Sequence, residues 1–466
     1  MQMPRYTGKL TDENIQSIFG GTADLIRREL NCGKWTLYAY AIDGLISGSD
    51  ASDYVIKPIM ENLSARSMQQ LYEQALSRTI YNTVAVESGN LDDVTSQLLN
   101  GFCVILFPQV GAIAFEVKTG EKRGISKPET EHTAKGAKDA FVETNRSNTS
   151  LVRRHIRVPE LRFYETAVGK HSQTNISVAW IEGITPPELV TRMKERINTM
   201  EADSLVMPAS VEEIVTGSRA TAFPLLQYTE RADRFCQGLL TGKIGLLVDG
   251  IPLGYLAPVD VGTLMQSPED WGKDYVSASC IRILRYGALL LSLLLPGFFI
   301  AMATFHQEMI PLQLLRAIIE SKESVPLSST MEVLTLLLAF ELLQESGVHL
   351  PQAFGQSVSI IGGIVVGSAA VEAKLISPAA LIAVSVAGVC GFVLPNRDFA
   401  DAVRVWRFVI AALSAIAGLF GWTIGFLFLL IHLAGLTSLG VPYLMPFSKG
   451  GKARILRNRQ KGSGQS

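Results

Sequence analysis

The hydrophobic pattern divides the chain into two parts. Residues 1 to about 282 alternate between short apolar runs and charged segments, as in a water-soluble protein. Apolar residues dominate from Tyr286 to Ser448, and the last 41 residues of that stretch, Phe408–Ser448, contain no Asp, Glu, Lys or Arg. Hydrocarbon offers backbone amides no partner, and about 20 apolar residues cross its core. The second part therefore predicts membrane-spanning helices.

The water-soluble part contains a weak internal repeat. A Leu-Leu-x-Gly sequence occurs at residues 98–101 and again at 239–242, and two apolar runs follow each copy. This pattern predicts a helix that ends at a capping glycine and is followed by a hairpin of two strands. In the second copy, Asp249-Gly250 lies where the hairpin would turn. We therefore predict an α/β head of two similar subdomains followed by an all-α polytopic membrane domain. The expected divisions are a first subdomain at 1–118, a linker at 119–140, a second subdomain at 141–281, a membrane domain at 282–447 and a basic tail at 448–466.

The five membrane segments that the pattern suggests differ in character. Tyr286–Phe305 and Ser377–Leu394 are apolar enough to cross, whereas Pro311–Ser321 carries charges and fits an interfacial helix. Met331–Gln344 has the length of a short span but includes two acids. Phe408–Leu436 is too long for one untilted crossing, so it tilts, bends near Gly418 and Gly421, or turns back as a helical hairpin. We expect about four crossings plus interfacial or re-entrant helices, with residues 397–407 as a polar loop.

The charge distribution predicts the orientation. Six Lys and Arg residues and no acids lie in the tail beyond Ser448, and Arg282 and Arg285 flank the first predicted span on the head side. Positive charge accumulates on the cytoplasmic side of membranes. The N-terminus lacks the apolar region of a secretory signal. Head and tail are therefore both expected in the cytoplasm.

Chemistry-bearing motifs are absent from the sequence. Gly242-Lys243 lacks the spacing and the hydroxyl of a phosphate-binding loop, and the five cysteines and six histidines have no metal-ligand spacing. A net charge of −1 gives no argument for nucleic acid. We expect no enzymatic activity, no cofactor and no metal.

One stretch of the head, Phe141–Arg157, is unusually rich in charged and amide side chains. Arginine presents a planar fork that suits carboxylates and other anions. The stretch is therefore either an anion clamp or, as we favour, a set of contacts between the subdomains or between neighbouring protomers. The candidate residues are Glu143, Asn145, Arg146, Arg153, Arg154 and Arg157.

The segment Gly355–Ala370 in the membrane part consists mainly of Gly, Ser, Ile and Val. Small residues allow close helix packing, and they also leave room for water and ions in a narrow pore. The pore-lining candidates are Ser357, Ser359, Gly362, Gly363, Val366 and Gly367. Ionisable residues at membrane depth mark pores, relays or interfaces, and the acidic selectivity or gating candidates are Glu332, Glu341, Glu345 and Glu372.

Over most of its length the sequence resembles the A subunits of GerA-type spore germinant receptors (the GerA/SpoVAF family). The stretches that carry the resemblance are Phe141–Arg157, Leu246–Pro258, Gln266–Trp271, Glu341–Pro351, Gly355–Ala370, Ile376–Pro378 and Leu439–Pro446. The resemblance implies a cytoplasmic head, a multi-pass domain in the spore inner membrane, and assembly with a B-type transporter-like subunit and a C-type lipoprotein. It also implies a homo-oligomer in lipid, such as a pentamer, that conducts cations when a nutrient binds the complex. The alternatives are a non-conducting scaffold and a secondary transporter of the germinant.

Overall fold

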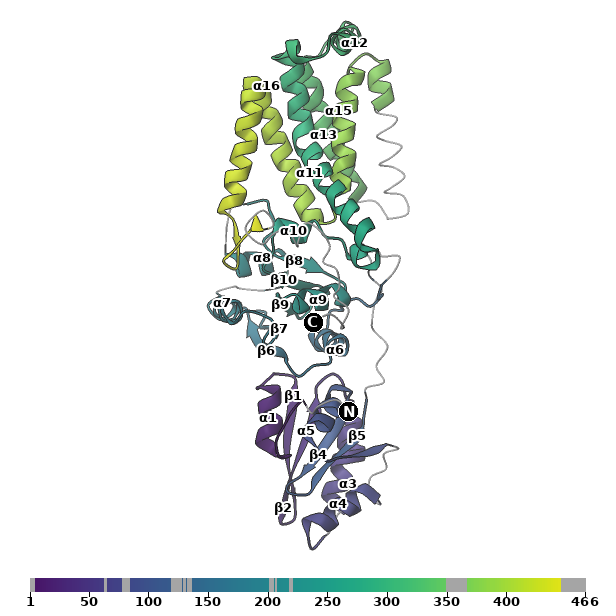
Figure 1. The fold of residues 1–466 in the computed structure, drawn as a ribbon, viewed down its shortest axis with the longest axis vertical. Helices are drawn as coiled ribbons and strands as arrows, with labels where there is room; N and C mark the ends of the chain where they lie inside the picture. The colour runs from purple at the N-terminus through teal and green to yellow at the C-terminus, as the bar shows by residue number, and fades with distance from the viewer. Residues whose placement is uncertain are drawn as a thin grey trace. The chain divides into compact units, whose positions relative to one another are not determined.

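The computed structural model describes residues 5–62, 65–77, 84–118, 128, 131, 136–200, 205, 208–217, 221–348 and 367–445. The chain forms two compact units (Figure 1). The first, called the head here, comprises Met1–Arg219 and Leu226–Pro258; the second, the helical unit, comprises Ala220–Leu225 and Val259–Ser466.

The first half of the head is a five-stranded antiparallel sheet with strand order β1-β2-β4-β5-β3. Helices cover both of its faces, and residues along a strand therefore alternate between two apolar cores. Val104 and Leu106 pack against α1 and α5, whereas Cys103, Ile105 and Phe107 face the core that includes α3 and α4. This explains why the strand sequence is continuously apolar. The elements are α1 (Asp12–Phe19), β1 (Leu25–Cys32), β2 (Trp35–Ile42), α2 (Gly48–Ala51), a π-helical turn (Ser52–Ile56), α3 (Lys57–Asn62), α4 (Met68–Ser77), β3 (Ala85–Ser88), α5 (Leu91–Leu99), β4 (Phe102–Phe107) and β5 (Gly111–Glu116).

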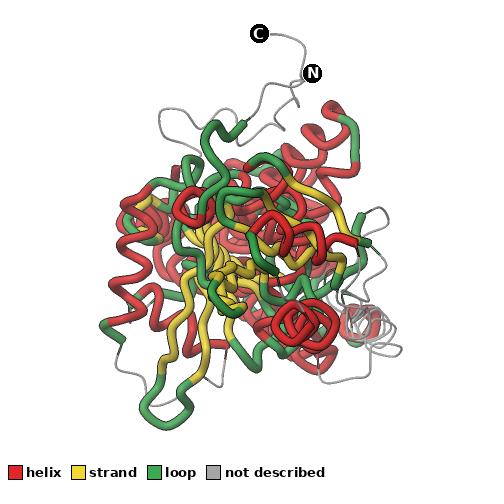
Figure 2. The backbone as a smooth tube through the Cα atoms, turned by 90° about the horizontal axis from the view of Figure 1, so that it is seen from below, coloured by secondary structure: helices red, strands yellow, loops and turns green. Residues whose placement is uncertain are grey.

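The second half of the head repeats this topology. Its sheet has the order β6-β7-β9-β10-β8, which matches the first sheet strand for strand; both sheets are visible in yellow in Figure 2. The glycines that end the repeated Leu-Leu-x-Gly sequences have equivalent roles: Gly101 and Gly242 both have positive φ, at +81° and +88°. The elements are α6 (Asn145–His155), β6 (Leu161–Val168), β7 (Thr174–Ile181), α7 (Pro187–Asn198), α8 (Pro208–Thr216), β8 (Gln227–Thr229), α9 (Ala232–Leu240), β9 (Ile244–Val248) and β10 (Gly254–Ala257). The predicted α/β fold of two similar halves is confirmed.

The helical unit follows the head, as predicted for the fold class. Two of its described helices, Tyr275–Thr304 and Arg397–Gly435, are long and apolar enough to cross a membrane, and Pro378–Phe392 is a shorter apolar helix. The elements are α10 (Val261–Leu264), a 3-10 turn (Pro268–Gly272), α11 (Tyr275–Thr304), a 3-10 turn (Gln307–Met309), α12 (Leu312–Lys322), α13 (Ser329–Val348), α15 (Pro378–Phe392), α16 (Arg397–Gly435), β11 (Thr437–Ser438) and β12 (Val441–Pro442).

Two predictions about α16 can be compared with the structure. The segment 397–407, expected as a polar loop, is the first part of this helix, and that expectation was wrong. The helix begins where the side chain of Asn396 accepts a hydrogen bond from the amide of Phe399 (2.8 Å). Phe399, Ala402 and Val403 then pack into the core of the unit. Their spacing of three and four residues is that of an amphipathic helix, despite the surrounding charges.

Farther along, α16 turns back on itself. Ala417 and Gly418 have non-helical backbone angles, with φ +60° and ψ −137° at Gly418. A Cβ added at Gly425 would lie 3.2 Å from Ile410, a residue that a continuous helix would hold far away. Of the three arrangements left open by the sequence, α16 adopts the helical hairpin, with a first arm before Ala417 and a second arm after Gly418 (Figure 1).

The end of the hairpin is fastened to the beginning of the helical unit. The Ser438 hydroxyl accepts a hydrogen bond from the amide of Val259 (3.0 Å) and donates one to the carbonyl of Leu225 (2.7 Å). The amide of Val261 donates to the carbonyl of Tyr443 (3.1 Å). Segments more than 170 residues apart in sequence are thus joined in one unit.

Candidate functional site

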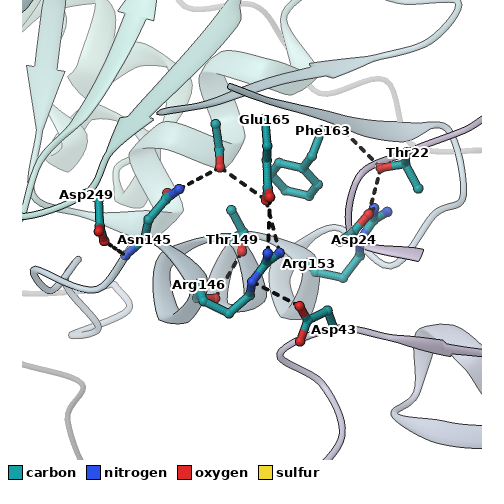
Figure 3. A network of polar contacts seen from close by, with 11 residues as sticks. Thr22, Asp24, Asp43, Asn145, Arg146, Thr149, Arg153, Phe163, Glu165 and Asp249 are labelled. Carbon is teal, nitrogen blue, oxygen red and sulfur yellow. Dashed lines mark hydrogen bonds and ion pairs between the residues drawn. The ribbon is translucent and has the colours of Figure 1, made fainter. Parts of the chain in front are cut away.

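In the head, α6 carries most of the charged residues singled out by the sequence. Its first amide, that of Asn145, donates to Asp249 Oδ1 (2.9 Å), so a carboxylate from the turn after β9 caps this helix (Figure 3). The Asn145 side chain donates to the Ser177 hydroxyl (2.8 Å). The backbone carbonyl of Glu143 accepts from the Gly250 amide (2.7 Å). These bonds fix the start of α6 against the second sheet.

Arg153, in the last turn of α6, forms a buried ion pair with the first half of the head. Its Nε and Nη2 donate to the two carboxylate oxygens of Asp24, both at 2.9 Å, and Nη1 donates to the carbonyl of Val158 (3.0 Å). Arg153 and Asp24 are 0% and 1% exposed. Asp24 also accepts from Thr22 Oγ1 (2.6 Å), as drawn in Figure 3. Every nitrogen of this guanidinium therefore has a protein acceptor.

Arg146 connects the same two halves near the other end of α6. It donates to both carboxylate oxygens of Glu165 (3.0 and 3.1 Å), and its Nε lies 3.1 Å from Asp43 Oδ2. Arg157 donates to the side chain of Asn100 (3.1 Å), and Arg154 is half-buried. Because Arg146 and Arg153 already hold protein carboxylates, the geometry favours contacts between the subdomains over an anion clamp.

A histidine–carboxylate pair lies beside this network. His155 Nε2 and Asp139 Oδ2 are 2.6 Å apart. The hydrogen bond to Asp139 raises the pKa of His155, against the opposing effect of burial. The same bond lowers the pKa of Asp139. The pair joins the end of α6 to the segment that precedes it.

In the helical unit, Glu332 is turned inward. It is 0% exposed, and its Oε2 accepts from the backbone amide and the hydroxyl of Ser377 (2.8 and 2.6 Å). Ser377 is the N-cap of α15, so the carboxylate lies at the positive end of that helix. Lys322 Nζ is 3.9 Å from Glu332 Oε1. This carboxylate therefore links α12, α13 and α15 within one chain.

Glu341 faces two arginines of α16. Its Oε2 accepts from Arg404 Nη1 (2.8 Å) and its Oε1 from Arg407 Nη2 (2.6 Å). Arg404 Nη1 also donates to Gln344 Oε1 (2.5 Å), and Arg404 pairs with Asp401 on its own helix. Two positive charges thus face the single negative charge of Glu341, and Asp401 balances the second of them.

The other predicted membrane candidates are not brought to these two sites. Glu345 and Glu372 are exposed, and Gly367 is buried, where a Cβ would lie 3.5 Å from Leu381. The candidates that lie outside the described residues are Ser357, Ser359, Gly362, Gly363 and Val366.

Sequence reasoning missed a further ion cluster at the start of α11. Asp270 Oδ2 accepts from Arg282 Nε (3.0 Å) and Arg285 Nη1 (2.8 Å), and all three residues are buried. The sequence pattern alone presents Arg282 and Arg285 as charges that flank the first span and set its orientation. The acceptor of both arginines, Asp270, belongs to the sequence Ser267-Pro268-Glu269-Asp270, which is typical of a helix start. This pattern, just ahead of α11, is the sequence signal that points to Asp270.

Comparisons with known proteins agree with this architecture. Residues 13–459 match the family described as Bacillus/Clostridium GerA spore germination protein. Spore germination protein KA of Bacillus subtilis (strain 168) is 33% identical over 446 residues, covering 94% of this chain and 82% of that protein. Spore germination protein GerLA of Bacillus cereus is 31% identical over 454 residues, covering 96% and 92%. An uncharacterized membrane protein of Bacillus subtilis (strain 168), YfkQ, is 32% identical over 439 residues, covering 94% and 85%.

Solved structures were compared as well. The N-terminal domain of the A subunit of the Bacillus megaterium spore germinant receptor GerK3 aligns with a TM-score of 0.42 and 22% identity, over 55% of this chain and 98% of that one. The family match spans nearly the whole sequence and includes both the head and the helical unit. The chain therefore belongs to the GerA family of spore germination proteins.

Proposed function

We propose that this protein is the A subunit of a nutrient germinant receptor that spans the spore inner membrane several times and oligomerises into a ligand-gated cation channel. Its head and basic tail face the cytoplasm, and it assembles with a B-type transporter-like subunit and a C-type lipoprotein. The membership in the GerA family supports the role in germination.

The observation that carries the membrane assignment is the inverted polarity of the helical unit. Glu332 and Arg407 are buried inside it, with exposed fractions of 0% and 1%. Its surface instead carries large apolar side chains, which in water would cost about 25 cal/mol per Å² of exposed apolar area. Lipid removes that cost. The exposed apolar residues include Leu290, Leu291, Ile382, Val389, Ile416, Phe420, Phe428 and Ile431.

The charge pairing argues that a conduction path forms between chains rather than within one. Glu332 and Glu341 are engaged inside their own helical unit, so an acidic ring at a shared axis needs another carboxylate. Glu372 is exposed and lies two residues after the end of the Gly/Ser/Val segment, Gly355–Ala370. Several copies that bring Glu372 and this segment together would attract monovalent cations.

Potassium release from liposomes that contain the purified receptor complex tests this proposal. We expect nutrient-dependent release that Gly363→Leu blocks and Glu372→Gln reduces, while Glu87→Gln, at an exposed position of the head, leaves release unchanged. A complex that assembles fully and releases no potassium would instead support a scaffold. Uptake of labelled nutrient into the liposomes would support a transporter.

A further inference from the structure

A short stretch between two elements of the head is built into the helical unit. Residues 221–225 follow α8 and precede β8 in the chain, yet they belong to the helical unit, whereas Leu226 belongs to the head again. Phe223 and Leu225 are 3% and 4% exposed and lie in the apolar core that includes both arms of α16. The chain therefore leaves the head, contributes to the core of the helical unit and returns.

Phe223 is the main anchor of this stretch. Its ring packs against three other rings, at centroid distances of 5.8, 6.1 and 6.2 Å: Phe399 of the first arm of α16, His432 of the second arm, and Tyr443 beyond the hairpin. Ring pairs at such distances attract each other. Two residues earlier, Thr221 Oγ1 and His432 Nε2 are 2.9 Å apart. The stretch therefore contacts both arms of the hairpin.

Two hydrogen-bonded strands of the head lead directly to the same core. β8 begins at Gln227, two residues after Leu225, and β10 ends two residues before Val259. Gln227 pairs with Leu256, so both connections leave the same end of this strand pair. Inside the helical unit the Ser438 hydroxyl donates to the Leu225 carbonyl (2.7 Å) and accepts from the Val259 amide (3.0 Å). The strand pair thus continues into two chain segments that are also held together.

The connection contains no exposed linker on either strand. Leu225 is buried in the core of the helical unit, and the next residue, Leu226, is 2% exposed and belongs to the head. At the end of β10, Ala257 and Val259 are 1% and 0% exposed. Exposed and flexible linkers let neighbouring domains move independently. Here a displacement of one unit is passed to the other within one or two residues.

We propose that Phe223 is a positioning residue that couples the head to the α16 hairpin, because it fixes both arms to the chain that continues into β8. Energetic coupling travels through packed side chains and rigid elements. The ring contacts of Phe223 supply the packed side chains, and the β8–β10 pair supplies the rigid element. The inference rests on the proposed channel function, for which it names the route between the water-soluble head and the membrane-spanning helices.

Hydrogen exchange of the full receptor complex, followed by mass spectrometry, tests the coupling without conduction. Phe223→Ala should speed exchange about tenfold both in the second arm of α16 and in β8 and β10. Phe298→Ala is the matched control, since Phe298 of α11 contacts Trp422 of the same arm at 5.8 Å. Exchange in this control should rise in the arm and stay unchanged in the two strands. Unchanged strands in Phe223→Ala, or equally fast strands in both variants, would overturn the proposal.

Two milder variants decide the question if Phe223→Ala fails to assemble. Phe223→Leu keeps a large apolar side chain in the core and should exchange nearly as slowly as the wild type. Thr221→Val removes the contact with the His432 nitrogen and leaves Phe223 in place. It should speed exchange in the arm and in the two strands by a smaller factor than Phe223→Ala. Strands that exchange at the wild-type rate in Thr221→Val would contradict the coupling.

Potassium release from liposomes that contain the same complexes measures the consequence for the channel. With a mixture of the common amino acids and glucose as the probe, Phe223→Ala should reduce release about tenfold without changing the concentration that gives half-maximal release. Phe298→Ala should release potassium as the wild type does. If the wild type conducts and Phe223→Ala conducts equally well, the coupling role is wrong. If the wild type releases no potassium, the channel proposal fails, and the exchange rates still decide whether Phe223 couples the two units.

Discussion

Arg153 and Asp24, 129 residues apart in sequence, form a two-point ion pair that is closed to solvent on both sides. The pair joins α6 of the second half of the head to the segment before β1 of the first. Removing one partner of a buried pair leaves an uncompensated charge, whereas replacing both can be nearly neutral.

Arg153→Met is therefore expected to lower the free energy of unfolding by about 3–5 kcal/mol, since Asp24 is left buried with one neutral donor. Thermal unfolding of the purified protein, followed by tryptophan fluorescence, measures the loss. Arg157→Met serves as the control, because Arg157 is exposed. The combined change Asp24→Leu with Arg153→Met should recover part of the stability; equal losses for both arginine variants would contradict the importance of the buried pair.

Asp249 acts as a helix cap from a distant turn. Asp249→Ala removes the acceptor for the first amide of α6 and should cost about 1 kcal/mol of stability, as for other N-caps. Asp249→Asn keeps an oxygen acceptor and should cost less. Thermal unfolding measures both losses. If Asp249→Asn is as unstable as Asp249→Ala, the charge of Asp249, rather than its hydrogen bond, stabilises the helix.

The His155–Asp139 pair predicts a pH dependence of stability. In the folded protein the pKa of His155 is raised above its unfolded value of about 6.5. Protonated His155 therefore contributes its full stabilisation below about pH 6.5. This contribution is lost as the pH rises through the raised pKa. Asp139 has a lowered pKa, so its contribution is present above the unfolded pKa and lost as pH falls through the folded one. Asp233 also favours the charged histidine. The midpoint of thermal unfolding should therefore fall as pH rises above about 6.5, and His155→Gln should flatten that slope. A parallel slope in the variant would rule out His155 as its source.

Gly418 is required for the turn of the α16 hairpin. Its angles, φ +60° and ψ −137°, are accessible essentially to glycine alone, and a Cβ there would lie 2.9 Å from Phe305. Gly418→Ala should cost about 1–3 kcal/mol. Gly435→Ala is the matched control, since a Cβ at Gly435 meets nothing within 4 Å. The two variants are compared by their yield after detergent solubilisation and by their thermal unfolding temperature. Equal values for Gly418→Ala and Gly435→Ala would show that the turn tolerates a side chain.

Local signals predicted the fold well where they were complete. The repeated Leu-Leu-x-Gly sequences and the Asp-Gly turn were enough to anticipate two similar α/β halves, because helix ends and hairpins depend on neighbouring residues. The polar loop at 397–407 failed because charge was given more weight than the spacing of Phe399, Ala402 and Val403. The partners of Arg153, Glu332 and Glu341 were beyond prediction, since they lie 129, 45 and 63 or more residues away and no local pattern specifies such pairs. On the sequence alone Glu332 and Glu341 are therefore selectivity or gating candidates, and the structure adds that each carboxylate is engaged by donors of its own chain.

The Ser438 hydroxyl, held between Val259 and Leu225, has a mechanical consequence. It joins β11, which follows the last helix, to two backbone segments at the start of the helical unit, so a force applied to the chain after β12 reaches these hydrogen bonds before it reaches the helices. Such a force would load the start of the helical unit without unwinding any helix.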